Sequence, residues 1–170
     1  LFSVPERRRN PNFKGEQYYS TPTEAHRIYW NQLDFYHKLA ETQSDAFRLV
    51  LTKGDLKSHL DLWQTQTNTL KPIGIIPLME GAEGIVDLDE LPDWWERGLR
   101  IIGLAWAGNR FCGGTREPGK LTAEGKDLIR AMAEVGFVLD LSHMDEPAAL
   151  ECLDLYPGQI IASHAMPQNW

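Results

Sequence analysis

The sequence lacks several features that mark large classes of protein. It holds only two cysteines, Cys112 and Cys152, in 170 residues, and these do not make the disulfide framework that staples small secreted domains. No apolar run approaches the ~20 residues that a helix needs to cross a bilayer. No signal peptide is visible in the chain, which opens on Leu1. We therefore expect a reducing, cytoplasmic location and no membrane span.

Basic charge is also scarce. The chain has 17 Lys and Arg against 24 Asp and Glu, for a net charge of -7, so it lacks the electrostatic footprint of a nucleic-acid partner. The one basic cluster, Arg7 to Arg9, is typical of a solvated turn. Gly113-Gly114 lacks the lysine and hydroxyl of a phosphate loop, and neither a Gly-x-Ser-x-Gly elbow nor a His-Glu-x-x-His helix occurs. Those enzyme classes are excluded.

What the sequence does contain is a regular succession of helix and strand patterns. Residues 1–20 are polar and punctuated by proline and glycine, which predicts a loop. Apolar residues at helical spacing predict helices over 21–43, 55–63, 88–98, 122–136 and 145–155. Short apolar runs predict strands over 47–51, 73–81, 100–106, 137–143 and 159–164. Strand–helix alternation without hairpins predicts an α/β fold with a parallel sheet, doubly wound or closed into a barrel.

Two segments carry a more specific prediction. The helix over 55–63 should turn Leu56, Leu60 and Trp63 toward the core. The loop over 107–121 follows the carboxyl end of a strand, where parallel α/β folds build their pockets. Three glycines after Asn109 give backbone freedom, so we expect this loop to border the site and to be mobile without substrate.

The carboxyl ends of four successive strands carry Glu80, Trp106, His143 and His164. Functional groups gather at these ends in parallel α/β sheets. Side chains alternate along a strand, so each polar residue should cap an apolar column that fills a barrel. The expected columns are Ile76 and Leu78, Leu139 and Leu141, and Ile160 and Ala162.

Two imidazoles and a carboxylate together suit zinc or a neighbouring transition metal. Each residue taken singly has a plainer interpretation, because a histidine at a strand end is often a structural residue and a lone glutamate is often a helix cap. His26, His37 and His59 are assigned that structural role. Cys112 has no histidine or aspartate spaced to activate it.

Five stretches carry a family resemblance: "MEGAEGI", "GLRIIGLAWAGN", "LTAEGKDLIRAM", "GFVLDLSHMDEPA" and "IIASHAMP". Over roughly residues 72–167 the chain resembles the membrane dipeptidase (renal dipeptidase, peptidase M19) family of the amidohydrolase superfamily. The resemblance implies a (β/α)₈ TIM barrel of the metal-dependent hydrolase type, with two zinc ions at its carboxyl end. Residues 1–170 are then a single domain, the central part of that barrel, covering about strands 2–6.

By resemblance, Glu80 bridges both metals, and His143 and His164 bind the second one. A hydroxide between the metals attacks the peptide carbonyl of a dipeptide. Trp106, which stands where the mammalian relative has a substrate-binding histidine, and Asn109 are the candidates for substrate binding. The resemblance also allows a homodimer.

The chain departs from the family pattern in three places. No predicted strand before Glu80 ends in the His-x-Asp pair of the first metal, and the family's substrate-carboxylate arginine and last-strand aspartate would fall beyond Trp170. We expect a truncated barrel that lacks strands 1, 7 and 8 and is inactive alone. Two alternatives stay open: another metal hydrolase of the superfamily that acts on small amides, and a non-catalytic relative.

Overall fold

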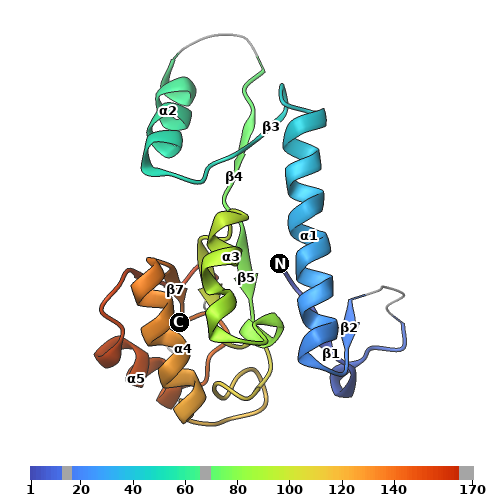
Figure 1. Cartoon of the computed structure of the whole chain (residues 1–170), viewed down its shortest axis with the longest axis vertical. Coiled ribbons are helices and arrows are strands. Elements are labelled where there is room, and N and C mark those ends of the chain that lie inside the picture. Colours follow the sequence, from blue (N-terminus) through green and yellow to red (C-terminus); the bar gives the residue numbers. More distant parts are fainter. Residues whose placement is uncertain (13–16, 66–69, 165–170) are drawn as a thin grey trace, which may run out of the picture.

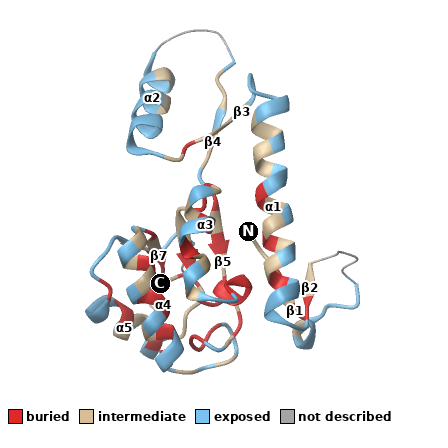
Figure 2. Cartoon of the chain, viewed as in Figure 1, coloured by how far each residue is buried: buried red, intermediate tan, exposed pale blue. Residues whose placement is uncertain are grey.

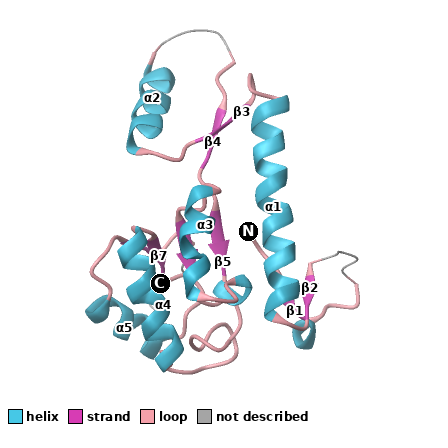
Figure 3. Cartoon of the chain, in the orientation of Figure 1, coloured by secondary structure: helices cyan, strands magenta, loops and turns pink. Residues whose placement is uncertain are grey.

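The centre of the molecule is a four-stranded parallel sheet in the order β5-β6-β7-β8. A computed structural model describes residues 1–12, 17–65 and 70–164. The four strands are β5 (Leu78–Glu80), β6 (Ile101–Gly103), β7 (Val138–Asp140) and β8 (Ile160–Ile161), each parallel to its neighbour. Helices separate them along the chain (Figure 3). The predicted α/β fold with a parallel sheet is confirmed, and its closure into a barrel stays a prediction.

The helices that connect these strands cover one face of the sheet. They are α3 (Leu91–Glu96), α4 (Ala123–Val135) and α5 (Glu146–Leu155). Met79, Ile102 and Leu139 lie side by side in register on that face and are fully buried, in one cluster with Trp94 and Met132 (Figure 2). Each such side chain contributes about 1.5–3 kcal/mol when buried. This buried layer fixes the sheet against its helices, with the polar residues at the carboxyl ends of the strands.

The long helix α1 (Pro22–Thr42) packs beside the turn that follows β5 (Figure 1). It begins with a capping box, in which the Thr21 hydroxyl accepts from the Glu24 N–H and the Glu24 carboxylate accepts from the Thr21 N–H. Gly84 lies in the adjoining turn, where a Cβ would come within 2.5 Å of the Tyr29 ring. The glycine therefore allows this close packing.

The predicted strand over 73–81 is wrong in one respect, because the run forms two strands. β4 (Ile73–Ile75) pairs in parallel with β3 (Phe47–Leu49), whereas β5 pairs with β6. Pro77 separates them, and proline has no N–H to donate to a neighbouring strand. The predicted run was thus divided between two sheets by its proline.

The buried face predicted for the second helix is also wrong. This helix, α2 (Lys53–Gln64), contains no buried residue, and the side chains of Leu56, Leu60 and Trp63 are 40%, 50% and 50% exposed. It adjoins the narrow β3–β4 pair, away from the four-stranded sheet (Figure 1). A two-stranded sheet offers too little apolar surface to cover a helix face.

The predicted loop over residues 1–20 contains two short strands, β1 (Val4–Pro5) and β2 (Tyr18–Tyr19), which pair in parallel. Phe2 also pairs with Glu80, and the Glu80 N–H donates to the Leu1 carbonyl at 2.8 Å. Main-chain pairing of this kind makes no demand on side-chain polarity, so the sequence pattern did not predict it. The N-terminal segment therefore lies along β5 and beside the residues at its end.

The basic cluster lies in an exposed 3₁₀ turn, as predicted, and its arginines are paired with carboxylates. Arg7 and Arg8 both bind the carboxylate of Glu117, at 2.6 and 2.9 Å, and these bonds lower the pKa of that carboxyl. The N-terminal segment is thereby tied to the loop over 107–121. Among the described helices, none has both the length and the apolar character needed to cross a membrane.

Candidate metal centre

Glu80, His143 and His164 converge at the carboxyl end of the sheet. The Oε1 atom of Glu80 lies 2.8 Å from His143 Nε2 and 3.3 Å from His164 Nε2, and the two Nε2 atoms are 2.8 Å apart. In the part of the chain that the structure describes, this is the one group of three or more His, Cys, Asp or Glu residues whose donor atoms could share an ion. The predicted convergence is confirmed, and the metal-binding role itself stays a prediction.

The two histidines do not stand above the apolar columns that were predicted for them. In register, Leu139 and Ile160 lie beside Met79 and Ile102, on the face opposite Glu80. The columns predicted below the two histidines are therefore wrong. Strand alternation ends with β7 and β8, before either histidine is reached. The backbone of His143 then turns into the left-handed region, with φ at 65°, which few residues other than glycine adopt.

A buried aspartate holds both histidine segments. Asp140 is 1% exposed, and its Oδ1 accepts from the N–H and the hydroxyl of Ser142 and from the N–H of Ser163. Its Oδ2 accepts from the Ser163 hydroxyl at 2.5 Å. Burial alone raises the pKa of Asp140, but the hydrogen bonds from Ser163 and Ser142 outweigh it and keep the pKa below its usual value. Asp140 is therefore an anion that fixes the two Ser-His turns relative to each other.

This arrangement favours one tautomer of His164. The single hydroxyl proton of Ser163 is donated to Asp140, so Ser163 Oγ can only accept from His164 Nδ1, which lies 2.7 Å away. The proton of a neutral His164 then sits on Nδ1, and Nε2 presents a lone pair toward Glu80 and His143. An imidazole that donates through its second nitrogen in this way is the usual form of a metal ligand.

The three donor atoms fit a divalent cation. The Glu80 carboxylate oxygen and the unprotonated Nε2 of His164 both face His143 Nε2. The two Nε2 atoms are 2.8 Å apart, a distance that requires a proton or a cation between them. A metal would replace that proton. The side chains of Glu80, His143 and His164 are 27%, 25% and 44% exposed, so the site is open to solvent on one side. Three protein ligands with an open position are typical of a catalytic zinc site.

The loop over 107–121 borders this centre, as predicted. The hydroxyl of Thr115 lies 3.0 Å from His143 Nδ1. The glycines also permit close backbone packing, in addition to the conformational freedom expected of them. A Cβ on Gly113 would lie 2.1 Å from the nitrogen of Gly119. They allow two stretches of the loop to touch, and Gly119 also donates to the Asp145 carboxylate at 2.9 Å.

Both candidate substrate residues lie in or beside this loop. The ring of Trp106 is 6.5 Å from the His143 ring. The side-chain amide of Asn109 is engaged at both ends, since it donates to the Leu104 carbonyl and accepts from the N–H groups of Phe111 and Cys112. Asn109 therefore closes its own loop, and contact of either residue with substrate stays a prediction.

The remaining candidates lie outside the centre. His26 bonds the Gly84 carbonyl at 3.1 Å, His37 bonds the Arg97 carbonyl at 2.7 Å, and His59 packs beside Trp63, which is the structural role assigned to them. Cys112 is buried, and burial raises the pKa of its thiol. It is not an activated nucleophile.

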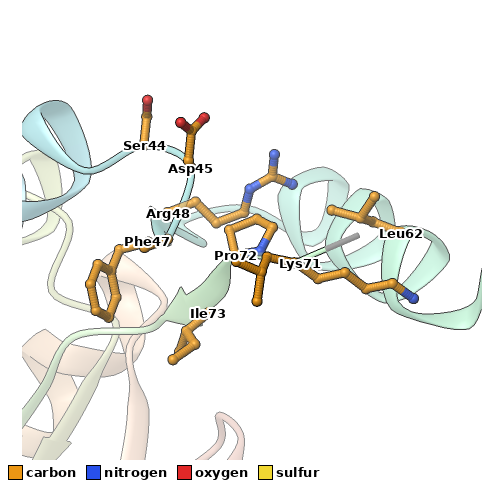
Figure 4. Close-up of a pocket in the computed structure, with 10 residues that line it drawn as sticks. Ser44, Asp45, Phe47, Arg48, Leu62, Lys71, Pro72 and Ile73 are labelled. Atoms are coloured by element: carbon orange, nitrogen blue, oxygen red, sulfur yellow. The ribbon is translucent and has the colours of Figure 1, made fainter. Parts of the chain in front are cut away.

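A separate hollow of about 610 Å³ lies between the β3–β4 pair and α2 (Figure 4). Its lining includes Asp45, Arg48 and Lys71. Ile73 also lines it, at the amino end of β4, whereas Glu80 lies at the carboxyl end of the following strand. None of its lining residues belongs to the candidate metal centre.

Sequence comparison decides the family. The membrane dipeptidase (peptidase family M19) sequence model matches residues 10–170. The chain belongs to this family. Among its relatives is an uncharacterized protein of the PQQ-III 3' region of Acinetobacter calcoaceticus, 31% identical over 155 residues, which are 85% of this chain and 46% of that protein. Dipeptidase tcpJ of Claviceps purpurea is 26% identical over 163 residues, 89% of this chain and 36% of that protein.

Solved structures agree in fold with this membrane dipeptidase family member. The probable dipeptidase PvdM of Pseudomonas aeruginosa superposes with a TM-score of 0.74 at 20% identity, over 86% of this chain and 38% of that one. A metallopeptidase of Rhodobacter sphaeroides, bound to a phosphinate mimic of the dipeptide L-Ala-D-Ala, gives 0.69 at 22% identity, over 85% and 42%. The chain thus spans less than half the length of these relatives.

Proposed function

We propose that the full-length protein hydrolyses dipeptides with zinc held by Glu80, His143 and His164. The observation that carries the proposal is the meeting of their three donor atoms within 4.8 Å of one another. The fixed tautomer of His164 supports it, because its lone pair points to the same place. Membership of the membrane dipeptidase family supports dipeptides as the substrate class.

Bound zinc would supply an acidified water, so that hydroxide attacks near neutral pH, and would polarise the peptide carbonyl. The chain's own residues do the rest. His143 and His164 present imidazole lone pairs, and the Glu80 carboxylate offsets the positive charge. A carboxylate has two oxygens, so Glu80 can serve two ions at once. The two His-x-Asp sequences of the chain lie at His59–Asp61, on helix α2, and at His143–Asp145, where His143 is already assigned. Neither is the strand-end pair that the family uses for its first metal, and a second zinc ion therefore needs ligands from elsewhere in the full-length protein.

We also propose that residues 1–170 are the central part of a single (β/α)₈ barrel. Four parallel strands with helices on one face and polar residues at their carboxyl ends support this. An eight-stranded barrel closes only when every edge is paired. The strands that would complete it correspond to the part of the relatives' length that this chain does not span.

The test is the metal content and activity of the full-length protein. We expect bound zinc and hydrolysis of L-L or L-D dipeptides. Glu80→Gln should remove most of the activity and lower the zinc content without unfolding the protein, because a neutral amide offers one weak oxygen and no charge. Glu96→Gln, on the exposed surface of α3, is the matched control.

Near-normal turnover with full zinc occupancy in Glu80→Gln would show that Glu80 is only a structural acid. Zinc binding with hydrolysis of small cyclic amides in place of dipeptides would favour another hydrolase of the superfamily. A full-length protein without zinc and without activity would identify a non-catalytic relative.

A further inference from the structure

A second hollow of about 250 Å³ lies beside the candidate metal centre, lined by Arg8, Trp106, Thr115 and Arg116. Two of these residues connect it to the centre. The Thr115 hydroxyl bonds His143 Nδ1, and the Trp106 ring lies next to the His143 ring. The hollow is therefore on the Nδ1 side of His143, whereas Glu80 and His164 meet its Nε2. One imidazole separates the hollow from the position of the metal.

Arg116 is the cation in this hollow that other residues leave free. It is exposed, and within the described ranges its guanidinium takes part in none of the hydrogen bonds, ion pairs or ring contacts. The neighbouring arginines differ, since Arg7 and Arg8 both bind Glu117. In a chain of net charge -7, this guanidinium beside the site is available to bind an anion.

The backbone holds Arg116 at a defined position. Gly114 and Glu117 exchange two main-chain hydrogen bonds, at 2.9 and 3.0 Å, so Thr115 and Arg116 form the tip of a tight turn. Arg116 is in the left-handed region there, with φ at 60°, a conformation that a non-glycine residue keeps only when its surroundings impose it. Arg7 and Arg8 anchor the base of the turn through Glu117. The same turn thus delivers Thr115 to His143 and Arg116 to the hollow.

We propose that this hollow is a specificity subsite in which Arg116 binds the side-chain carboxylate of an acidic dipeptide. The inference rests on the proposed dipeptidase function. A guanidinium pairs with a carboxylate through two parallel hydrogen bonds, and the apolar ring of Trp106 covers the methylene groups of the substrate side chain. The α-carboxylate is bonded too close to the scissile amide to pass an imidazole ring, whereas the side-chain carboxylate of aspartate or glutamate lies one or two bonds further from Cα.

The experiment compares dipeptides of equal size that differ only in charge. In the full-length, zinc-loaded protein, kcat/KM is measured for Ala-Glu against Ala-Gln and for Glu-Ala against Gln-Ala. We expect Arg116→Ala to lower the acid-to-amide ratio of at least one pair by about 10-fold or more, and Arg116→Lys to restore part of it. Lys120→Ala removes the same charge from an exposed position of the same loop and should leave both ratios unchanged.

Equal loss for acidic and neutral dipeptides would overturn the proposal, since Arg116 would then serve the α-carboxylate or the fold. Unchanged ratios would overturn it as well. Should the full-length protein hydrolyse no dipeptide, titration of the metal-free protein with N-acetylglutamate and N-acetylglutamine separates the two failures. Preferential binding of the acid that Arg116→Ala abolishes would keep the subsite while the proposed function falls, and no preference would overturn the subsite too.

Discussion

The serine before each histidine is as informative as the histidine itself. Ser163 donates to Asp140 and accepts from His164 Nδ1, which leaves His164 Nε2, the nitrogen that faces Glu80, without a proton. Ser142 donates to the same aspartate and accepts from the His164 N–H. The two Ser-His sequences therefore share one anion, and this explains why the same dipeptide follows each of the two strands.

Replacing Ser163 by alanine should weaken zinc binding about 10–100-fold, which is the usual effect of losing the partner of a ligating histidine. The Nδ1–H of His164 would lose its acceptor, and the ring could adopt the other tautomer. Competition with a chromophoric chelator measures the affinity directly. Ser163→Thr keeps a hydroxyl and should retain most of the affinity.

Ser44→Ala, at an exposed position, is the control for a lost serine hydroxyl. Unchanged zinc affinity in Ser163→Ala would mean that the hydroxyl does not set the tautomer of His164.

Sequence reasoning found the three converging residues and missed the groups that hold them. Glu80, His143 and His164 could be predicted because polar residues at the ends of apolar runs stand out. Asp140 carried a signal too, as an acid inside the apolar run "FVLDL". Thr115 had no such signal, since its contact with His143 spans 28 positions and depends on how the loop folds back.

Among the elements, the loop over 107–121 contributes most to the candidate site. It carries Thr115 and Arg116, and it is held by close backbone contacts that glycine makes possible. Gly113 is the position where this need is greatest, because the added Cβ would meet the backbone of Gly119. Backbone atoms cannot move aside as the end of a flexible side chain can.

Gly113→Ala should therefore lower the free energy of unfolding by about 1–3 kcal/mol, as overpacking of a well-packed site does. Gly54→Ala is a matched control on α2, where the new Cβ meets only the Thr52 hydroxyl oxygen at 3.6 Å. Glycine in a helix costs roughly 0.5–1 kcal/mol relative to alanine, so the control should be neutral or stabilising. Urea denaturation measures the free energy of unfolding of both variants. An unchanged value in Gly113→Ala would show that the loop can shift without loss of stability.

The order of the elements could be predicted because each helix and strand has its own local pattern. Which strands pair with one another could not be predicted from these local patterns. Pro77 marks the point where the chain leaves the β3–β4 pair for the four-stranded sheet, and the Leu1 carbonyl accepts a hydrogen bond from the Glu80 N–H. Both features depend on which backbone edge is free, and apolar periodicity contains no information about that.

At the scale of the whole molecule, the exposed apolar side chains of α2 and β4 favour association with other molecules. Leu60, Trp63 and Ile73 are 50%, 50% and 56% exposed, and such side chains gathered in one region favour association. β8 also presents an unpaired edge within the described sheet. A homodimer of the full-length protein stays a prediction.

These 170 residues, expressed alone, should self-associate and should not hydrolyse dipeptides, because the proposed two-metal site would lack the ligands of its first metal. Light scattering with size-exclusion chromatography and a panel of L-L and L-D dipeptides measures both properties, with the full-length protein as the reference. A monomeric fragment with the turnover of the full-length protein would contradict either the ligand assignment or the partial barrel.

The burial of both thiols has a practical consequence for following motion in solution. Cys112 lies in the loop over 107–121 and Cys152 lies in α5, and both are buried. Burial raises the pKa of Cys152 to about 12 and that of Cys112 further, so neither reacts with an alkylating reagent while the structure is closed. The rate at which iodoacetamide labels Cys112 therefore measures how often the loop opens, and labelling of Cys152 reports the opening of the helix. Mass spectrometry of the two peptides measures both labelling rates in a single sample.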